Sequence, residues 1–192
     1  MKESKAMRVL LFALAAFGIV SGAYGSEVVS ISMFPGFQRV ISAPAPEDPA
    51  WNDALKRFAN LARSQQVEAV NLWVNDHPYM DDMSNWGVPD FWETPSEFLV
   101  HGGDCEDFAM AKYIMLRTLG IQIADMKLSV GILQSGITHA LLQVDIGNGP
   151  LTLDNESPEP IHGKRSGFTP YYDLNERQGI VYEQAVSSIR SN

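Results

Sequence analysis

Hydrophobic residues follow a helical period in the first half of the chain. Between residues 51 and 76, apolar positions recur at helical intervals, which predicts one or two helices with a break near Ser64. A further run over 104–119 stops at Gly120, a residue type that commonly follows the last turn of a helix. The apolar faces of these helices are expected to lie in the core.

The pattern changes to short β-type runs after this point. Runs over 126–133, 139–144 and 151–153 are separated by glycine-containing turns, and 179–182 is expected to form a last strand. Helices followed by antiparallel strands predict an α+β fold, in which the N-terminal helices pack on the sheet.

Capping residues mark a shorter helix. Thr94 suits the N-cap, Pro95 the first helical position and Glu97 the third position of a capping box. The helix is expected to end by Gly102-Gly103, and the next one begins directly after these glycines. Two residues without side chains would also let another chain approach at this point.

The N-terminus has the pattern of a secretory signal peptide. Basic residues occur among the first eight positions, an apolar run covers 9–20, and small residues over 21–25 offer a cleavage point before Ser26. An uncleaved membrane anchor is the alternative, but the apolar run is short for a span. We therefore expect residues 1–25 to be removed on export.

The remaining 167 residues suffice for one domain with a sizeable core. Residues 26–49 contain four prolines and few periodic apolar positions, so they are predicted to form an irregular lead-in to a single domain over 50–192. The formal net charge is −9, and it becomes −11 without residues 1–25, with 11 basic and 22 acidic side chains. This acidic balance argues against a nucleic-acid partner.

Cys105 is the only cysteine in the chain. Exported proteins usually use cysteines in disulfide pairs, so an unpaired one calls for a reason. A buried, unreactive thiol is the common explanation. The first turn of a helix favours a nucleophile instead, because its N–H groups and dipole stabilise a thiolate and can hold an oxyanion.

Residues 77–92 are rich in Asp, Asn, Pro, Gly and aromatic side chains. Two interpretations stay open: a packed structural loop, or the wall of a binding cleft, since binding residues concentrate on loops. If the loop lines a cleft, an indole N–H of Trp86 or Trp92 is a candidate for a second oxyanion donor.

Three carboxylates flank the cysteine, at Asp104, Glu106 and Asp107. Negative neighbours should raise the pKa of the thiol, so a compensating charge is needed. The carboxylates either cap the helix N-terminus or bind Ca²⁺ with further ligands from elsewhere. From these residues alone capping is the simpler explanation, because three adjacent carboxylates are not an EF-hand loop.

A cysteine nucleophile needs a base, and the chain has four histidines. His101 is so near Cys105 in the sequence that it is expected to stabilise the turn, and His77 and His162 lie in predicted loops. His139 begins a β-type run after a glycine-containing loop and is therefore the preferred base.

Asp154 is the candidate for the acid that orients the imidazole. A four-residue hairpin loop over 145–148 would place His139 opposite Asp154 and assemble the pair. The commoner two-residue Asn-Gly turn at 148–149 would pair Asp154 with Gln143 and leave His139 about 13 Å away along the strand.

Four segments, taken in order, carry a family resemblance: 90–99, 103–113, 138–142 and 153–155. The most specific is 103–113, with Gly-Asp-Cys-Glu-Asp followed by Ala-Lys-Tyr. Over most of residues 50–180 the chain resembles the bacterial transglutaminase-like cysteine proteinases. One departure is Ala140, where the family often has a bulkier residue.

The resemblance implies a papain-like or transglutaminase-like core with a Cys-His-Asp triad. The triad residues would be Cys105, His139 and Asp154. It also implies dependence on Ca²⁺, which reverses the preference for simple capping. The metal ligands would be Asp104, Glu106 and Asp107.

Members of the family cut a double-alanine site in the N-terminal region of a large cell-surface adhesin, which promotes biofilm dispersal. The periplasmic domain of an inner-membrane receptor for cyclic di-GMP holds them inactive. The resemblance therefore implies a periplasmic location, an adhesin substrate and a receptor partner for this chain.

Two other functions stay open. A transglutaminase or amidase forms the same acyl-enzyme and differs only in the nucleophile that resolves it. A non-catalytic periplasmic binding module would keep the fold around an unreactive thiol.

Overall fold

The structure, a computed structural model, describes residues 25–183. The predicted signal peptide therefore lies outside the described residues except for Gly25, and so do the last residues of the predicted domain. Within the described range, no helix has the length and apolar character needed to cross a membrane.

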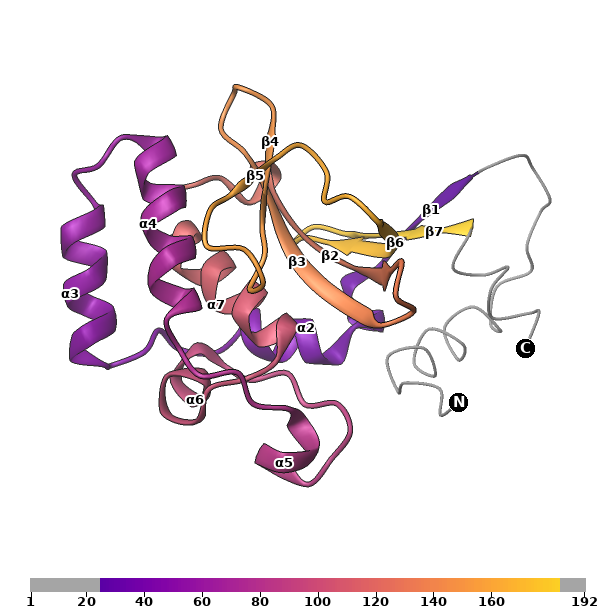
Figure 1. Cartoon of the computed structure of the whole chain (residues 1–192), viewed down its shortest axis with the longest axis horizontal. Helices are drawn as coiled ribbons and strands as arrows, with labels where there is room; N and C mark the ends of the chain where they lie inside the picture. Colours follow the sequence, from indigo (N-terminus) through magenta and orange to yellow (C-terminus); the bar gives the residue numbers. More distant parts are fainter. Residues whose placement is uncertain (1–24, 184–192) are drawn as a thin grey trace.

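A seven-stranded antiparallel sheet forms one side of the molecule (Figure 1). The strand order is β1-β7-β6-β2-β3-β4-β5, so β3 is supported by a neighbour on each side. The strands are β1 (Ser26–Val29), β2 (Met126–Leu133), β3 (Thr138–Asp145), β4 (Pro150–Leu153), β5 (Ile161–His162), β6 (Phe168–Leu174) and β7 (Gly179–Tyr182).

The helices come mainly from the first two thirds of the chain. Helices α3 and α4 stand side by side at the end of the molecule away from β1 and β7 (Figure 1). The helices are η1 (Ile31–Met33), α2 (Pro35–Ile41), α3 (Pro49–Phe58), α4 (Arg63–Asn75), α5 (Asp82–Trp86), α6 (Pro95–His101), α7 (Cys105–Thr118) and η2 (Ile123–Asp125).

Helix α7 is the centre of the fold. It packs against β2 and β3 of the sheet and against α4 and α6. Its residues 107–116 are all buried, as expected for a helix that is covered on every side. Because α7 begins at Cys105, the packing of the core fixes the position of the thiol.

Most of the predicted elements are confirmed. The run over 51–76 forms α3 and α4, and β2 and β7 have the predicted bounds. Thr94 caps α6, and the Glu97 carboxylate accepts the Thr94 N–H at 2.7 Å, which completes the capping box. The α+β class follows from these elements.

The prediction of an irregular lead-in over 26–49 is wrong for its first part, where β1, η1 and α2 lie. Pro35 and Pro49 open α2 and α3, because proline suits the first helical position. Phe37 and Val40 of α2 are buried in the core, and β1 pairs with β7. The folded unit therefore includes residues 26–41, ahead of the predicted boundary at residue 50.

The pattern of β6 is interrupted by Pro170, so the sequence does not predict this strand. Its pairing with β2 skips one residue there: Val130 pairs with Tyr172, and Gly131 with Pro170. A β-bulge is a place where a sheet tolerates proline. At Gly131 a Cβ would lie 2.2 Å from the Thr169 carbonyl oxygen, so the bulge also requires glycine.

The β3–β4 hairpin has neither of the two expected registers. Its loop consists of residues 146–149, and continuing the register past β4 brings Asp154 opposite Leu141. Each expected register differs from this one by two residues. An even shift leaves every side chain on its own face of the sheet, so His139 and Asp154 remain diagonal neighbours.

Candidate active site

Cys105 is the first residue of α7 and is half-buried, which confirms its predicted place in the first turn. The backbone N–H of Ala140 on β3 faces the Cys105 sulfur at the helix start and lowers the pKa of the thiol. Gly103 pairs with Tyr79 in a parallel bridge, and the Tyr79 ring stacks on Phe108 with centroids 6.4 Å apart. The thiol thus lies where α7, β3 and the loop before α5 meet.

The two glycines before the thiol serve packing within the chain. A Cβ at Gly102, where φ is 75°, would lie 2.3 Å from the Pro78 carbonyl oxygen. A Cβ at Gly103 would lie 2.6 Å from Asp107, and the Gly103 carbonyl accepts the Met80 N–H at 2.9 Å. The space expected for an approaching chain is therefore filled by residues 78–80 and Asp107.

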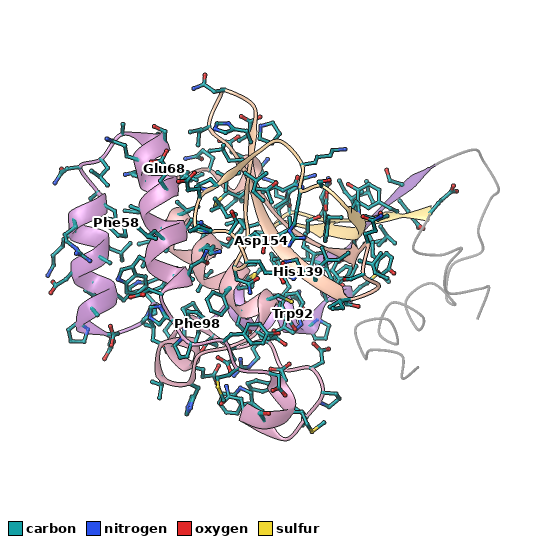
Figure 2. The ribbon with its side chains drawn as sticks, viewed as in Figure 1. Phe58, Glu68, Trp92, Phe98, His139 and Asp154 are labelled. Carbon is teal, nitrogen blue, oxygen red and sulfur yellow. The ribbon has the colours of Figure 1, made fainter. Side chains whose placement is uncertain are left out.

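His139 and Asp154 form a buried pair near the middle of the molecule (Figure 2). His139 Nε2 lies 2.9 Å from Asp154 Oδ1. Burial raises the pKa of Asp154, but hydrogen bonds from His139 and the Glu156 N–H, with the His139 and Arg165 charges, bring it to about 2. A carboxylate at Nε2 holds a proton on that nitrogen and leaves Nδ1 available as a base.

The other histidines have packing or surface positions. His77 Nδ1 lies 3.2 Å from the Trp73 carbonyl oxygen, and the two rings pack edge to face. His101 is exposed at the end of α6 with its ring against Trp86, and His162 is exposed on β5. These placements agree with the choice of His139 as the candidate base.

Two aspartates from the segment over 77–92 join the predicted metal ligands: Asp82, the first residue of α5, and Asp90 from the loop after it. Oxygens of Asp82, Asp90 and Glu106 lie within 4.8 Å of one another, and so do those of Asp82, Asp104 and Asp107. Sequence spacing did not single out Asp82 and Asp90, because the fold, and not local sequence, brings them to the start of α7. The acidic composition of the loop was the only signal.

This group of carboxylates fits a divalent cation. Burial is the largest cause that raises the pKa of Asp104, Glu106 and Asp82, and neighbouring negative charges add to it. Asp82 Oδ1 and Asp104 Oδ1 are buried without a hydrogen-bond partner among the described residues. Converging carboxylate oxygens that lack donors suit a hard cation such as Ca²⁺.

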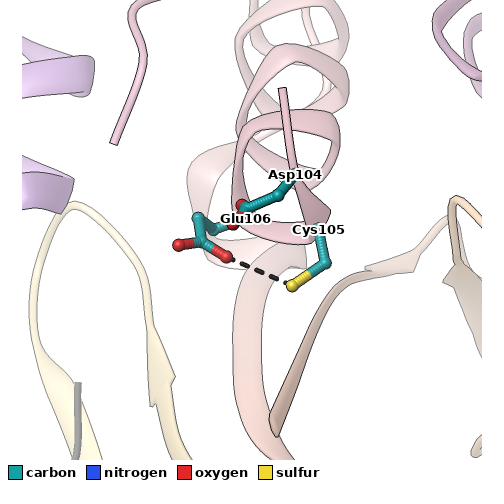
Figure 3. Close-up of side chains that lie close together, drawn as sticks. All are labelled: Asp104, Cys105 and Glu106. Atoms are coloured by element: carbon teal, nitrogen blue, oxygen red, sulfur yellow. Dashed lines mark hydrogen bonds between the residues drawn. The ribbon is translucent and has the colours of Figure 1, made fainter. Parts of the chain in front are cut away.

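The thiol of Cys105 donates a hydrogen bond to Glu106, with 3.1 Å between Sγ and Oε2 (Figure 3). Burial raises the pKa of Cys105 well above its usual value, and the charges of Glu106 and Asp104 raise it further. The Ala140 N–H acts in the opposite sense but does not outweigh them. This arrangement favours the protonated thiol.

Asp107 links the loop before α6 to the start of α7. Its Oδ1 accepts the Glu93 N–H at 2.7 Å, and its Oδ2 accepts the Asp104 N–H at 3.0 Å. Both oxygens therefore already serve backbone donors, as in the capping explanation. The role of Asp107 as a metal ligand stays a prediction.

The two indole candidates for an oxyanion donor are both engaged. Trp86 Nε1 donates to Glu93 Oε1, and Trp92 Nε1 donates to Asp90 Oδ1 at 3.2 Å. Trp92 also packs on Gly36 of α2, where a Cβ would lie 2.6 Å from the ring. Both indoles are therefore engaged within the fold, although Tyr79, Met83 and Val88 of the same segment are exposed, and the Cys105 backbone N–H stays the predicted donor.

A separate open depression of about 870 Å³ lies beyond the end of α7. Its lining includes Arg63 and Lys127. Arg63 donates to the Leu119 and Gly120 carbonyls, and Lys127 pairs with Asp173. These two cations are thus used by the fold, and Lys164 is a third cation in the lining.

A known protein family matches most of the chain. The family described as bacterial transglutaminase-like cysteine proteinase, BTLCP, matches residues 49–179 of the chain. No curated protein sequence matches significantly.

Solved structures of LapG from Legionella pneumophila are similar to the whole described fold. The calcium-bound form has a TM-score of 0.63 at 23% identity, covering 85% of this chain and 98% of that one. A second LapG structure has a TM-score of 0.61 at 25% identity, with 84% and 92% covered. An EGTA-treated form has a TM-score of 0.62 at 25% identity, with 80% and 86% covered. The predicted transglutaminase-like core is thereby confirmed.

Proposed function

The chain belongs to the bacterial transglutaminase-like cysteine proteinases, and we propose that it is a calcium-dependent endopeptidase with the triad Cys105, His139 and Asp154. The observation that carries this proposal is the buried His139–Asp154 hydrogen bond, together with the Ala140 N–H, next to His139 on β3, which faces the Cys105 sulfur and lowers the pKa of the thiol. Base, acid and thiol then lie near the start of β3.

In the proposed reaction, His139 takes the thiol proton as Cys105 Sγ attacks the carbonyl carbon of the scissile peptide. The proton passes to the leaving amine as the C–N bond breaks, which leaves an acyl-enzyme. Water then attacks this thioester with His139 as base, releasing the carboxylic acid and the thiol. Asp154 holds the imidazole in the useful tautomer, and the Cys105 N–H stabilises the oxyanion.

The metal in this proposal is Ca²⁺, held by the carboxylates around the start of α7. The residues that would hold it are Asp82, Asp90, Asp104 and Glu106, with Asp107 beside them. When bound, it would supply positive charge that offsets the carboxylates next to the thiol. Support comes from LapG, which is known both with calcium bound and after treatment with EGTA.

The cellular role follows the family pattern. We extend the proposal to an exported periplasmic enzyme that cuts a double-alanine site in the N-terminal region of a large surface adhesin. The periplasmic domain of a cyclic di-GMP receptor would be its inhibitor. The signal-peptide pattern over 1–25 supports export, and the resemblance around 103–113 supports the substrate and the receptor.

The test is cleavage of an adhesin fragment by the protein that starts at Ser26. We expect cleavage at Ala-Ala with calcium, none with EGTA, and none by Cys105→Ala. A fragment with Ala-Ala replaced by Arg-Arg is the matched substrate control. A folded protein that cuts neither fragment with calcium would contradict the proposal, and incorporation of a primary amine into a glutamine substrate would identify a transglutaminase instead.

A further inference from the structure

The side of Asp154 that faces away from His139 is held by an arginine. Arg165, from the segment between β5 and β6, forms an ion pair from its Nε to Asp154 Oδ2. The same guanidinium pairs through Nη2 with Glu156 Oε2. The Arg165 side chain is 19% exposed and that of Asp154 is 0% exposed, so the pair is largely shielded from water.

Each oxygen of the Asp154 carboxylate therefore has its own partners. Oδ1 faces His139 Nε2 at 2.9 Å and accepts the Glu156 N–H at 3.0 Å, while Oδ2 forms the ion pair with Arg165 and has no hydrogen-bond partner among the described residues. The Asp154 backbone carbonyl accepts a hydrogen bond from Asn75 Nδ2 at 2.9 Å. Rotation of the carboxylate would break contacts at both oxygens, so its orientation is fixed.

A second cation lies near Asp154 but does not make this contact. Lys112 of α7 is buried, and its charge interacts with that of Asp154. Its Nζ has no hydrogen-bond partner among the described residues. Arg165 is thus the cation that is placed to orient the carboxylate.

The charge of Arg165 also offsets the negative charge of a side-chain group that could otherwise attract a metal ion. Ligand atoms of His139, Asp154 and Glu156 lie within 4.8 Å of one another. The guanidinium stands against both carboxylates and supplies the positive charge that this group needs. A planar fork suits two carboxylates better than the single ammonium of lysine would.

We propose that Arg165 is a positioning residue for the triad: it fixes Asp154 so that Oδ1 faces His139 and the imidazole proton stays on Nε2. This inference rests on the proposed function, because it deepens the role of the same triad. Without Arg165 the carboxylate can turn, and His139 can place its proton on the nitrogen needed as the base. Loss of orientation of this kind lowers turnover and not substrate binding.

The kinetic test measures cleavage of the adhesin fragment that the parent protein cuts. It compares Arg165→Gln and Arg165→Lys with Arg117→Gln. Arg117 is the matched control, since it forms a half-buried ion pair with Glu176 through its own Nη1. We expect Arg165→Gln to lower kcat by about 10- to 100-fold with KM within about twofold, and Arg165→Lys to recover part of the loss. Unchanged kcat in a folded Arg165→Gln protein would overturn the proposal.

A second readout does not depend on cleavage. In Cys105→Ala protein, the ¹⁵N chemical shifts of His139 report which ring nitrogen carries the proton. We expect the Nε2–H form in the parent and a mixture of tautomers after Arg165→Gln. If that variant fails to fold, Arg165→Lys is measured instead, with a smaller shift in the same direction expected.

An unchanged His139 tautomer in the folded variant would overturn the positioning role. A changed tautomer in a protein that cuts no adhesin fragment would support the positioning role and contradict the proposed function. The two failures are therefore distinguishable.

Discussion

The Cys105 thiol donates its hydrogen bond to Glu106, the same carboxylate that converges with Asp82 and Asp90. One side chain thus has two competing uses: as the acceptor that keeps the thiol protonated, and as a metal ligand. A cation bound to Glu106 would withdraw the acceptor and neutralise the charge that raises the pKa of Cys105. Metal binding and thiol reactivity should therefore be linked.

The first prediction concerns alkylation of the thiol. Calcium should speed the reaction of Cys105 with iodoacetamide near neutral pH by about 10-fold relative to EGTA, because more thiolate is present. Glu106→Gln should react faster than the unchanged protein in EGTA and should lose the response to calcium. Mass spectrometry of timed samples measures both rates. Glu159→Gln, an exposed carboxylate elsewhere, is the control, and equal rates with and without calcium would contradict the link.

The second prediction concerns stability and pH. The pKa values of Asp104 and Glu106 are raised in the fold, so above about pH 4 the folded protein holds more protons than the unfolded chain. In EGTA the free energy of unfolding should therefore fall as pH rises from about 4 into the neutral range. Asp154, with its pKa lowered to about 2, acts in the opposite sense and loses its contribution only below about pH 4.

Calcium should reduce or reverse this fall, because it binds the ionised carboxylates. Urea unfolding at a series of pH values, with calcium and with EGTA, measures the effect. A free energy of unfolding in EGTA that rises between about pH 5 and about pH 8 would argue against a repulsive carboxylate group.

The third prediction concerns the ligands that come from the loop. Asp82→Asn and Asp90→Asn should each weaken calcium binding by about 10-fold, because each removes a negative charge from the converging oxygens. Asp81→Asn is the matched control: its carboxylate caps α5 at the Ser84 N–H, and asparagine can keep that role. Titration calorimetry gives the affinities. Equal calcium affinities for all three variants would mean that Asp82 and Asp90 are not ligands of the metal.

The fourth prediction concerns the close approach at Gly102. Gly102→Ala should lower the free energy of unfolding by about 3 kcal/mol, because a Cβ would lie 2.3 Å from the Pro78 carbonyl oxygen. Gly136→Ala shares the positive φ but meets nothing within 4 Å, so it should cost only about 1 kcal/mol. Chemical denaturation measures both, and equal losses would mean that backbone strain alone explains the glycine.

Local signals predicted the parts of the site that depend on local structure. The Thr94 and Glu97 capping box and the helix that begins at Cys105 follow from residues near them in the sequence. The His139–Asp154 contact was predicted with a register that proved wrong by two residues. The pair forms nevertheless, since an even shift preserves the face and side chains span the diagonal.

The parts that escaped prediction depend on long-range packing. Asp82 and Asp90 reach α7 because Gly102 and Gly103 let residues 78–80 lie against its start, and no spacing in the sequence encodes that contact. Arg165 likewise reaches Asp154 only through the path of the chain between β5 and β6. The prolines led to a wrong prediction of irregular chain over 26–49. Pro35 is instead the first residue of a helix, a position that proline suits.

The pairing of β1 with β7 has a practical consequence for protein engineering. Ser26 lies opposite Tyr182, so the first and last strands of the described fold are antiparallel neighbours. A short linker could join the chain after Tyr182 to Ser26, with new ends opened in the exposed β3–β4 loop at residues 146–149. Such a circular permutant would keep every strand pair while the β3–β4 connection is cut. It would test whether His139 and Asp154 still meet when the short loop between their strands is open.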